Sequence, residues 1–525
     1  PLLTMVKRGD GKIGIFSYCL DEITEFVEKN PNYLVQMLTK ALGENEISNL
    51  YYYSSYGSDE EYWNAYSLAN TGSADRLPNL GAYGIVIIIY IILVGPGLYV
   101  FLKKKDISRL YGTTVLVAAM GVSCVVYMMG VGTRFTSQFF HVASVLELDG
   151  VQVEETSYMS VQTPDNRSFA MSIPATYDVT TLTRTSRYNE QFADDFQPEK
   201  EGNVKIQEDQ QGTSVSAKRS KAFEPRFFKV TKSGDLISQG NISGKIMWND
   251  GKISGTIENR LPFALEDAAL VLYGQMYLIG NLESGAILTF DEQELLTWPV
   301  GMSYVAASSV IGSDADGELS DSEYLEDQSR SNLYSYYLGE TFYDYTSEAR
   351  LVAIGPDGGI LSEGTIKEQS ADGVTLYSAK ISVSSDEEEA VYRSVLKHTP
   401  KITSGSGAMY GDALSMYGAE PIAIEYFLGD NLNVEQVSFL PVSDVFLDKP
   451  EYYYLKKFEG AVYFYNQLTG VYDRVDLSKI HFSVDELRPY LSQQNSMMVK
   501  YTADKDGTVG STLLLPHLMV TGREG

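Results

Sequence analysis

Two long apolar runs within 83–131 constrain this chain more than any other feature. The runs are GIVIIIYIILVGPGLYVFL from Gly84 and LYGTTVLVAAMGVSCVVYMMGV from Leu110, with 19 and 22 residues. At a helical rise of about 1.5 Å per residue, each run is long enough to cross the ~30 Å hydrocarbon core of a bilayer. Neither run has the polar face that a surface helix of a soluble protein carries. The pattern therefore predicts a two-helix transmembrane hairpin over 83–131.

The link between the two runs predicts how this hairpin is oriented. Its seven residues, 103–109, include one acidic residue and four basic ones: Lys103, Lys104, Lys105 and Arg109. Basic residues beside membrane helices are retained on the cytoplasmic side. These four residues are the predicted topology determinants. They place the short loop in the cytoplasm and both flanking regions outside.

The net charge of −28 lies almost entirely on the large region that follows the hairpin. Residues 1–82 carry six Lys/Arg and eleven Asp/Glu, the hairpin carries four and one, and the remaining charge of −26 falls on 132–525. Such an acidic surface repels phosphate groups, and no basic stripe opposes it. Nucleic acid is therefore not an expected partner, and anionic headgroups are disfavoured by the overall charge.

Gly95, Pro96 and Gly97 interrupt the first membrane helix. Proline cannot donate its backbone hydrogen bond, so the helix is expected to bend here. The triplet is predicted to be either a packing position within the hairpin or a hinge or notch for a partner helix. There is no Asp, Glu, Lys, Arg or His between Tyr83 and Leu102 or between Leu110 and Val131, so a proton or ion pathway is not predicted.

The fold class predicted from local patterns is a multidomain membrane protein. Before the hairpin, one strand (11–20) and one helix (30–42) indicate the C-terminal half of an α/β domain that begins upstream, in a longer protein. After it, short alternating strands separated by Gly, Asn, Asp and Pro indicate a mainly-β extracytoplasmic region of tandem sandwiches or jelly rolls, with a short helical insert. The predicted divisions are the α/β part (1–50), a juxtamembrane link (51–82), the hairpin (83–131), a β-sandwich (132–312) with a polar loop (188–221), a helical linker (313–347) and a second β-sandwich (348–525).

Several phrases resemble a family of poorly characterised bacterial membrane proteins. They are the membrane segment from Ile88, IIYIILVGPGLYVFLKKKDISRLYGTTVLVA, and the phrases GTIENRLPFALEDAALVLYGQMYLIGNLESG and AVYFYNQLTGVYDRV. The resemblance implies an extracytoplasmic domain like class I glutamine amidotransferases, then a transmembrane hairpin and a β-rich C-terminal region. GDGKIGIFSYCLDE is similar to the closing strand of that amidotransferase-like domain. The family has no settled activity to transfer.

No residue pattern predicts catalysis, a cofactor or a metal site. Cys19 lacks the small flanking residues of an exposed nucleophile, and no histidine precedes His141. No two histidines stand at a spacing that favours zinc, and no phosphate-binding glycine loop occurs. The acidic segment with Asp314, Asp316, Glu318 and Asp321 does not match a calcium loop and is read as solvated, with adventitious calcium as the alternative. The chain as given is therefore predicted to be non-enzymatic.

The predicted function is a membrane-anchored extracytoplasmic binding or scaffold protein of the bacterial cell envelope. Its expected partners are the lipid bilayer, an envelope or transport protein and, through exposed tyrosines such as 51–53 and 452–454, cell-wall glycan. The simpler reading of these tyrosines is that they suit half-buried strands. The alternative function is an anchor and accessory part of an envelope enzyme or export-system subunit whose active part lies upstream or in a partner.

Overall fold

The computed structural model describes most of the chain. It covers residues 3–8, 11–17, 23, 26, 29–30, 33, 37, 60–69, 80–105, 107–130, 138–150, 152–164, 166, 168–183, 204–209, 212–218, 221–235, 240–249, 251–312, 321–341, 348–362, 370–385, 391–394, 401–404, 414–417, 421–429, 432–476, 478–493, 495–504 and 511–524. The chain divides into two compact units, one of 1–64 with 182–202 and one of 65–181 with 203–525.

The first unit contains an antiparallel hairpin of β1 (Leu3–Arg8) and β2 (Gly11–Phe16). β2 occupies the first part of the strand predicted over 11–20, and β1 was not predicted. The predicted helix over 30–42 lies outside the described residues apart from Asn30, which is not helical, and Tyr33 and Met37, which are helical. Cys19 also lies outside them.

The predicted juxtamembrane link, 51–82, contains a helix, which corrects the sequence reading. α4 (Glu60–Ala69) buries Ala65, Leu68 and Ala69. Leu68 and Ala69 lie three and four residues after Ala65, so the three residues share one helical face. The many polar residues around this short apolar stripe concealed it from a reading based on composition.

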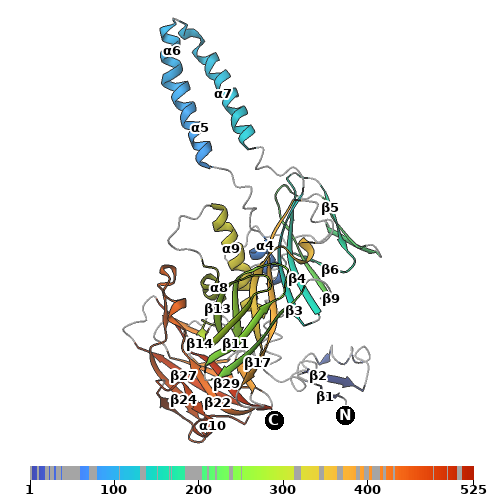
Figure 1. Ribbon diagram of the computed structural model, residues 1–525, viewed down its shortest axis with the longest axis vertical. Helices are drawn as coiled ribbons and strands as arrows, with labels where there is room; N and C mark the ends of the chain where they lie inside the picture. Colours follow the sequence, from blue (N-terminus) through green and yellow to red (C-terminus); the bar gives the residue numbers. More distant parts are fainter. Residues whose placement is uncertain are drawn as a thin grey trace. The chain divides into compact units, whose positions relative to one another are not determined.

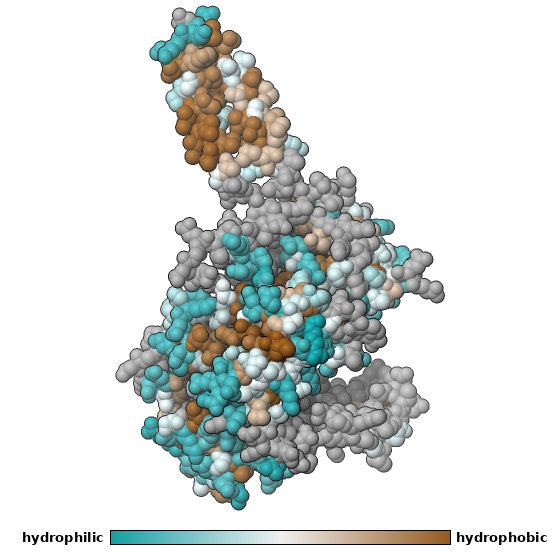
Figure 2. All heavy atoms as spheres, in the orientation of Figure 1, coloured by the Kyte–Doolittle hydropathy of each residue, from teal (hydrophilic) through white to brown (hydrophobic). Residues whose placement is uncertain are grey.

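The predicted hairpin is formed by helices that Figure 1 shows running antiparallel. They are α5 (Leu80–Ile92), the π-helical turn η3 (Leu93–Gly97), α6 (Leu98–Lys104), the short 3-10 turn η4 (Ser108–Leu110) and α7 (Tyr111–Met129). Two helical spans, Gly81–Lys104 and Tyr111–Met129, are long and apolar enough to cross a membrane. Figure 2 shows apolar residues covering the visible face of this hairpin, with hydrophilic residues at its tip.

A twelve-stranded sheet forms the centre of the second unit. Its main path runs β15-β13-β12-β16-β17-β3-β4-β9-β6. These strands are β3 (Phe139–Asp149), β4 (Gln152–Gln162), β6 (Asp178–Leu182), β9 (Arg226–Asp235), β12 (Leu265–Leu272), β13 (Gln275–Leu282), β15 (Leu296–Thr297), β16 (Ala349–Gly355) and β17 (Ser370–Ser385). The first strand after the hairpin, β3, pairs in parallel with β17 and antiparallel with β4.

The long strand β17 joins this path to a second layer. Its residues 370–379 pair with β3, while residues 382–385 pair with β10. The second layer consists of β10 (Ile242–Asn249), β11 (Lys252–Asn259) and β14 (Ile287–Glu294). As predicted from Asn249-Asp250-Gly251, β10 and β11 form a hairpin, and Gly251 has a φ of 76°.

Sheet pairing corrects the predicted division at 313–347. β16 and β17, which follow that segment, pair with β12 and β3, which precede it. The residues before and after the segment therefore share one sheet instead of forming two separate sandwiches. Strand alternation shows which residues are buried, but it does not identify the strand with which each strand pairs.

Helices cover part of the central sheet. α8 (Ser303–Val310), α9 (Asp321–Tyr336) and the π-helical turn η7 (Tyr337–Thr341) supply them. The hydroxyl of Tyr334 in α9 donates to the carbonyl of Val352 in β16 at 2.9 Å. The predicted helical linker thus contains α9, packed on the sheet.

The predicted polar loop over 188–221 contains two strands, which is a third correction. β7 (Val204–Asp209) and β8 (Gly212–Ala217) form a sheet with β5 (Phe169–Pro174). Gly212 occupies the turn with a φ of 154°, where an added Cβ would lie 2.4 Å from the carbonyl oxygen of Ile173. The high charge of the region hid an alternation that only β8 buries well.

The last part of the chain forms three further sheets. They are a four-stranded sheet, β18-β29-β22-β26, a five-stranded sheet, β19-β21-β27-β24-β25, and a three-stranded sheet, β20-β28-β23. Their strands are β18 (Val391–Ser394), β19 (Lys401–Ser404), β20 (Ser415–Tyr417), β21 (Ile422–Phe427), β22 (Leu432–Leu440), β23 (Leu455–Lys457), β24 (Gly460–Asn466), β25 (Val471–Val475), β26 (His481–Ser483), β27 (Ser496–Ala503), β28 (Thr512–Leu514) and β29 (His517–Glu524). Short helices η11 (Asp444–Phe446), η12 (Pro450–Tyr452) and α10 (Val484–Leu487) connect them.

Two apolar clusters lie on the same side of the central sheet. One lies between that sheet and the β10-β11-β14 layer and includes Ile246, Leu270 and Leu351. Leu440 and Met519 of the C-terminal sheets belong to it as well. The other lies against the β5-β8-β7 sheet. It includes residues from β3, β4 and β9 and from the short helix η8 (Gly359–Leu361). The fold is therefore mainly β, with two membrane-length helices, as the sequence predicted at that level.

Candidate functional site

The surface of the helical hairpin is the most distinctive exposed feature of the described residues. Ile85, Leu93 and Leu116 are each about 60% exposed. Side chains of this kind are normally buried in a folded protein, and large exposed apolar patches mark contact with a membrane or another protein. Each of the two helices is long and apolar enough to cross a bilayer.

The polar end of the hairpin carries the residues predicted to set topology. Lys103, Lys104 and Lys105 lie at the end of α6 and in the turn after it, all exposed, and Arg109 lies in η4. The ammonium of Lys103 lies 5.8 Å from the ring centroid of Tyr99. Cations at a helix C-terminus also interact favourably with the helix dipole. The structure thus gathers all four predicted residues at one tip.

The Gly95-Pro96-Gly97 segment lies in η3, the π-helical turn. This wider turn accommodates Pro96 inside the helix. The hydroxyl of Tyr111, the first residue of α7, donates to the carbonyl of Val94 at 3.1 Å. Sequence reasoning located the helix interruption, but it did not identify Tyr111 as the residue across the hairpin that hydrogen-bonds there.

The open end of the hairpin also has a close contact. A Cβ added to Gly130, just after α7, would lie 3.2 Å from the hydroxyl oxygen of Tyr83 in α5. A Cβ at Gly84, Gly112 or Gly121 would meet nothing within 4 Å, so these three glycines do not pack closely against the other helix. Tyrosines thus make a contact between the two helices near each end of the hairpin.

A second feature is an aromatic platform of Tyr304, Tyr452, Tyr453 and Tyr454, in which Tyr304 and Tyr453 are exposed and Tyr452 is buried. Tyr304 comes from α8, and the other three come from η12 and the residues after it. The hydroxyls of Tyr304 and Tyr454 lie 3.1 Å apart, and the rings of Tyr304 and Tyr452 are 5.9 Å apart. Burial raises the pKa of Tyr304, and the hydrogen bond with Tyr454 raises it further. The platform is held in one arrangement while Tyr453 remains 81% exposed.

Two polar side chains attach this platform to α8. The hydroxyls of Ser308 and Tyr452 lie 2.8 Å apart, and the ammonium of Lys449 donates to the Ser308 carbonyl. Burial lowers the pKa of Lys449, opposed by nearby Glu451. Of the two tyrosine runs noted in the sequence, 452–454 joins a rigid exposed surface, whereas 51–53 lies outside the described residues.

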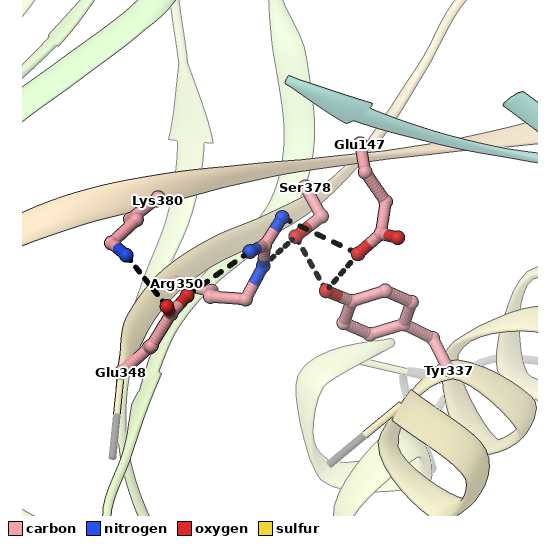
Figure 3. A network of polar contacts seen from close by, with 6 residues as sticks. All are labelled: Glu147, Tyr337, Glu348, Arg350, Ser378 and Lys380. Atoms are coloured by element: carbon pink, nitrogen blue, oxygen red, sulfur yellow. Dashed lines mark hydrogen bonds and ion pairs between the residues drawn. The ribbon is translucent and has the colours of Figure 1, made fainter. Parts of the chain in front are cut away.

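A buried polar network lies between the central sheet and η7. It joins six side chains, drawn in Figure 3: Glu147, Tyr337, Glu348, Arg350, Ser378 and Lys380. The Arg350 guanidinium donates to the Ser378 hydroxyl at 2.8 Å and lies 3.3 Å from a Glu147 carboxylate oxygen. Tyr337 donates to the same Glu147 oxygen at 3.2 Å. Because Arg350 is 5% exposed and paired on several sides, the network connects three strands to a helix and offers no open substrate site.

A second buried carboxylate, Glu155, lies on the opposite face of the sheet between the two apolar clusters. It accepts hydrogen bonds from the backbone N–H of Ile360 at 2.8 Å, from the Ser157 hydroxyl at 2.8 Å and from the Tyr177 hydroxyl at 3.0 Å. Burial raises the pKa of Glu155, and these hydrogen bonds oppose the rise. The carboxylate thus connects β4 to two loops, which is a structural role.

The three histidines that the structure describes do not come together. His141 faces Asp372 across the β3–β17 pair at 4.0 Å, His481 bonds to Ser438 at 2.8 Å, and His517 is buried beside Gly274. His398 lies outside the described residues, as do Asp314, Asp316 and Glu318 of the acidic segment. Among the residues that the structure describes, no group of three or more His, Cys, Asp and Glu side chains could hold a metal ion.

Comparison with known proteins gives a domain match without an assigned activity. Residues 241–384 match a domain family described as a domain of unknown function, DUF8725. That segment runs from β10 to β17 and includes the β10-β11-β14 layer, which packs on the larger apolar cluster. No curated protein matches the chain. The matched description mentions neither an amidotransferase nor a bacterial source, so the family resemblance stays a prediction.

Two solved structures resemble part of the chain weakly. The yeast delta-COP-I mu-homology domain is 10% identical, with 48% of this chain and 99% of that chain covered and a TM-score of 0.24. The same yeast domain complexed with the Dsl1 WxWxV peptide is 9% identical, with the same coverage and a TM-score of 0.21. Scores this low do not establish a shared fold.

Proposed function

We propose that this chain is a membrane-anchored extracytoplasmic binding or scaffold protein of the bacterial cell envelope, without catalytic activity in the segment described. The observation that carries the proposal is the pair of exposed apolar helices with all of the hairpin's basic residues at its tip. Basic residues at the short turn favour a cytoplasmic tip. The β-rich region, which holds most of the acidic residues, then lies outside.

The tightly connected polar groups of the β region support the non-catalytic part of the proposal. Arg350 and Glu155 are each held by several protein groups, so their charges serve the packing of sheets, loops and helices. Catalytic groups would instead need access to a substrate at hydrogen-bonding distance. The amidotransferase-like resemblance, which concerns residues 1–50, and an envelope or export-system partner belong to this proposal as well.

Labelling with a membrane-impermeant maleimide tests the proposed orientation. In a full-length chain with Cys19 and Cys124 replaced by serine, one variant carries Ile107→Cys at the tip and another Thr469→Cys in the β24–β25 turn. Both positions are exposed. Intact protoplasts should label position 469 at once and position 107 only after permeabilisation. The reverse pattern would overturn the orientation, and extraction of the chain by alkaline carbonate would overturn the anchor.

The binding part of the proposal centres on the aromatic platform and cell-wall glycan. Exposed rings held rigidly can stack against the apolar face of a sugar, and a contact between a ring and its partner contributes about 0.5–1.5 kcal/mol. Detergent-solubilised chain should co-sediment with purified cell-wall sacculi, and Tyr453→Ala should weaken this binding about two- to twelvefold. Tyr324→Ala, which removes a tyrosine 58% exposed on α9, is the matched control. Equal effects of both substitutions would exclude the platform as the binding surface.

A further inference from the structure

Phe223 is an exposed aromatic residue in a strained backbone conformation. Its φ is 60°, and its side chain is 57% exposed. A bulky residue rarely adopts positive φ, because its Cβ approaches the backbone closely. Here the Phe223 N–H donates to the Thr163 carbonyl at 2.8 Å, and the Ala222 N–H donates to the Asn166 side chain at 2.9 Å. The turn 221–226, called the Phe223 loop below, is therefore fixed so that its ring points away from the core.

The chain around this loop is basic, in contrast to the acidic remainder. Residues 218–232 contain six Lys/Arg and one Glu, although the whole chain has 41 Lys/Arg and 69 Asp/Glu. Lys218 is exposed, and the Lys221 side chain is 81% exposed. Glu224 lies 3.1 Å from Lys221 and 3.5 Å from Arg226. The loop therefore presents an apolar ring flanked by excess positive charge.

Both connections to the hairpin arrive at the end of the sheet where this loop lies. β3 begins at Phe139, ten residues after α7 ends at Met129, and Phe139 pairs with Gln162 beside Thr163. On the other side, Tyr66 of α4 contacts the Phe227 ring at 6.0 Å.

The lengths of these connections limit how far the loop can lie from the hairpin. Ten residues extend over at most about 35 Å, and the eleven from Ala69 to Leu80 over about 40 Å. The Phe223 loop is thus restricted to the zone next to the bilayer that the hairpin would span.

We propose that the Phe223 loop contacts anionic lipid headgroups of the same membrane, with the Phe223 ring at the boundary between headgroups and acyl chains. The proposal rests on the proposed membrane anchor. Aromatic rings favour that boundary, and lysines next to an anionic surface are attracted to it. Asp372, at the same end of the sheet, lies 4.0 Å from His141 across the β3–β17 pair, and its side chain is 42% exposed, so one acidic group opposes the lysines there.

The overall negative charge does not oppose this contact strongly. Charges separated by more than about 8 Å of physiological salt solution are largely screened, so the local charge of a touching loop outweighs the distant acidic surface. The contact would fix the β region at a second point besides its covalent connections. A scaffold held in this way presents one constant face away from the membrane.

Lipid-borne quenchers test the proposal on the full-length chain reconstituted into vesicles. A fluorophore is attached to Ala222→Cys, next to the intact Phe223, in a chain whose Cys19 and Cys124 are serine. Vesicles of phosphatidylcholine with and without phosphatidylglycerol carry a nitroxide at headgroup depth. Quenching at 222 should be strong with phosphatidylglycerol and should greatly exceed quenching of the same label at Thr469→Cys. Each lysine contributes about a fivefold change in the contact equilibrium. Lys218→Glu with Lys221→Glu should therefore abolish the quenching, and Phe223→Ser should weaken it.

Two controls make every outcome decisive. Lys252→Glu with Lys456→Glu changes the same charge at two other exposed lysines and should leave the quenching at 222 unchanged. A label on native Cys124, which is exposed on α7, reports with deep nitroxides whether the hairpin is in the bilayer. Quenching at 124 with none at 222 overturns the loop contact alone. Absence of quenching at both positions overturns the loop contact and the membrane anchor together.

Discussion

The hairpin and the two packed sheet layers around the larger apolar cluster, called the sandwich below, use the same apolar residue types in opposite ways. Ile85 and Leu93 of the hairpin are 60% and 61% exposed, whereas Ile246 and Leu270 of the sandwich are fully buried. Water makes the second arrangement favourable, by about 25 cal/mol for each Å² of apolar surface removed from it. The first arrangement is favourable only where the surroundings are themselves apolar. Burial thus distinguishes the part of the chain that packs against itself from the part whose apolar side chains need apolar surroundings such as lipid.

The same contrast extends to the hydrogen bonds. In the sandwich, buried polar groups such as Arg350 and Glu155 each have several partners from different elements. In the hairpin, Tyr111 supplies a hydrogen bond to Val94 across the two helices, and an added Cβ at Gly84, Gly112 or Gly121 would touch nothing. The sandwich is therefore a cooperative unit, while the hairpin depends on its helices being individually stable in lipid.

The largest expected difference between the two regions concerns the removal of apolar groups. Leu270→Ala leaves a cavity between two sheets and should lower the free energy of unfolding by about 2–5 kcal/mol. Ile88→Ala, at a position 57% exposed, should change it by less than about 0.5 kcal/mol. Urea unfolding in detergent, followed by the fluorescence of Trp248 and Trp298, measures both. Equal effects would mean that the hairpin surface is packed inside the protein.

Two glycines extend this comparison to the junction of the central and C-terminal sheets. Gly274 and Gly251 have similar φ values, 79° and 76°. A Cβ on Gly274 would lie 2.1 Å from the His517 ring, whereas one on Gly251 would meet nothing within 4 Å. Gly274→Ala should cost about 3 kcal/mol or more from overpacking and backbone strain, and Gly251→Ala about 1 kcal/mol. The same unfolding experiment checks both, and similar costs would show that His517 does not pack against Gly274.

Sequence patterns identified these two regions because each has its own local signature. Continuous apolar runs predicted the hairpin from residue 83, three residues after α5 begins, and alternation with turn residues predicted the β-rich region. The pairing of β17 with both β3 and β10 has no local signature, because register and partner choice depend on residues far apart in sequence. The Tyr111–Val94 bond and the assembly of Tyr304 with Tyr452 were missed for the same reason.

Acid should destabilise the sandwich through His517. Burial lowers the pKa of His517 to about 4, whereas the unfolded value is 6.5. Because the folded pKa is the lower one, the unfolded state binds the proton more tightly. Stability is complete above about pH 6.5 and falls by about 3 kcal/mol as the pH drops to about 4, at 1.36 kcal/mol per pH unit. Unfolding free energies at several pH values should show this decline, and His517→Gln should flatten it. His481→Gln, at an exposed position, is the control, and an unchanged slope in the first variant would contradict the assignment.

The smallest expected effect concerns the hairpin itself. Tyr111→Phe removes the hydroxyl that donates to the Val94 carbonyl in the π-helical turn. Hydrogen bonds between membrane helices contribute about 0.6–2 kcal/mol, because the acceptor finds no water within the bilayer. The variant should therefore let the two helices separate more readily, measured as a broader distance distribution between spin labels at Ile92→Cys and Gly112→Cys with native cysteines replaced. Tyr90→Phe, on the same helix as Val94, should leave the distribution unchanged. If both variants broaden it equally, the aromatic packing of the helices and not the Tyr111 hydroxyl holds the hairpin closed. An unchanged distribution in Tyr111→Phe would instead show that the contacts of Tyr83 with the residues around Gly130 are sufficient.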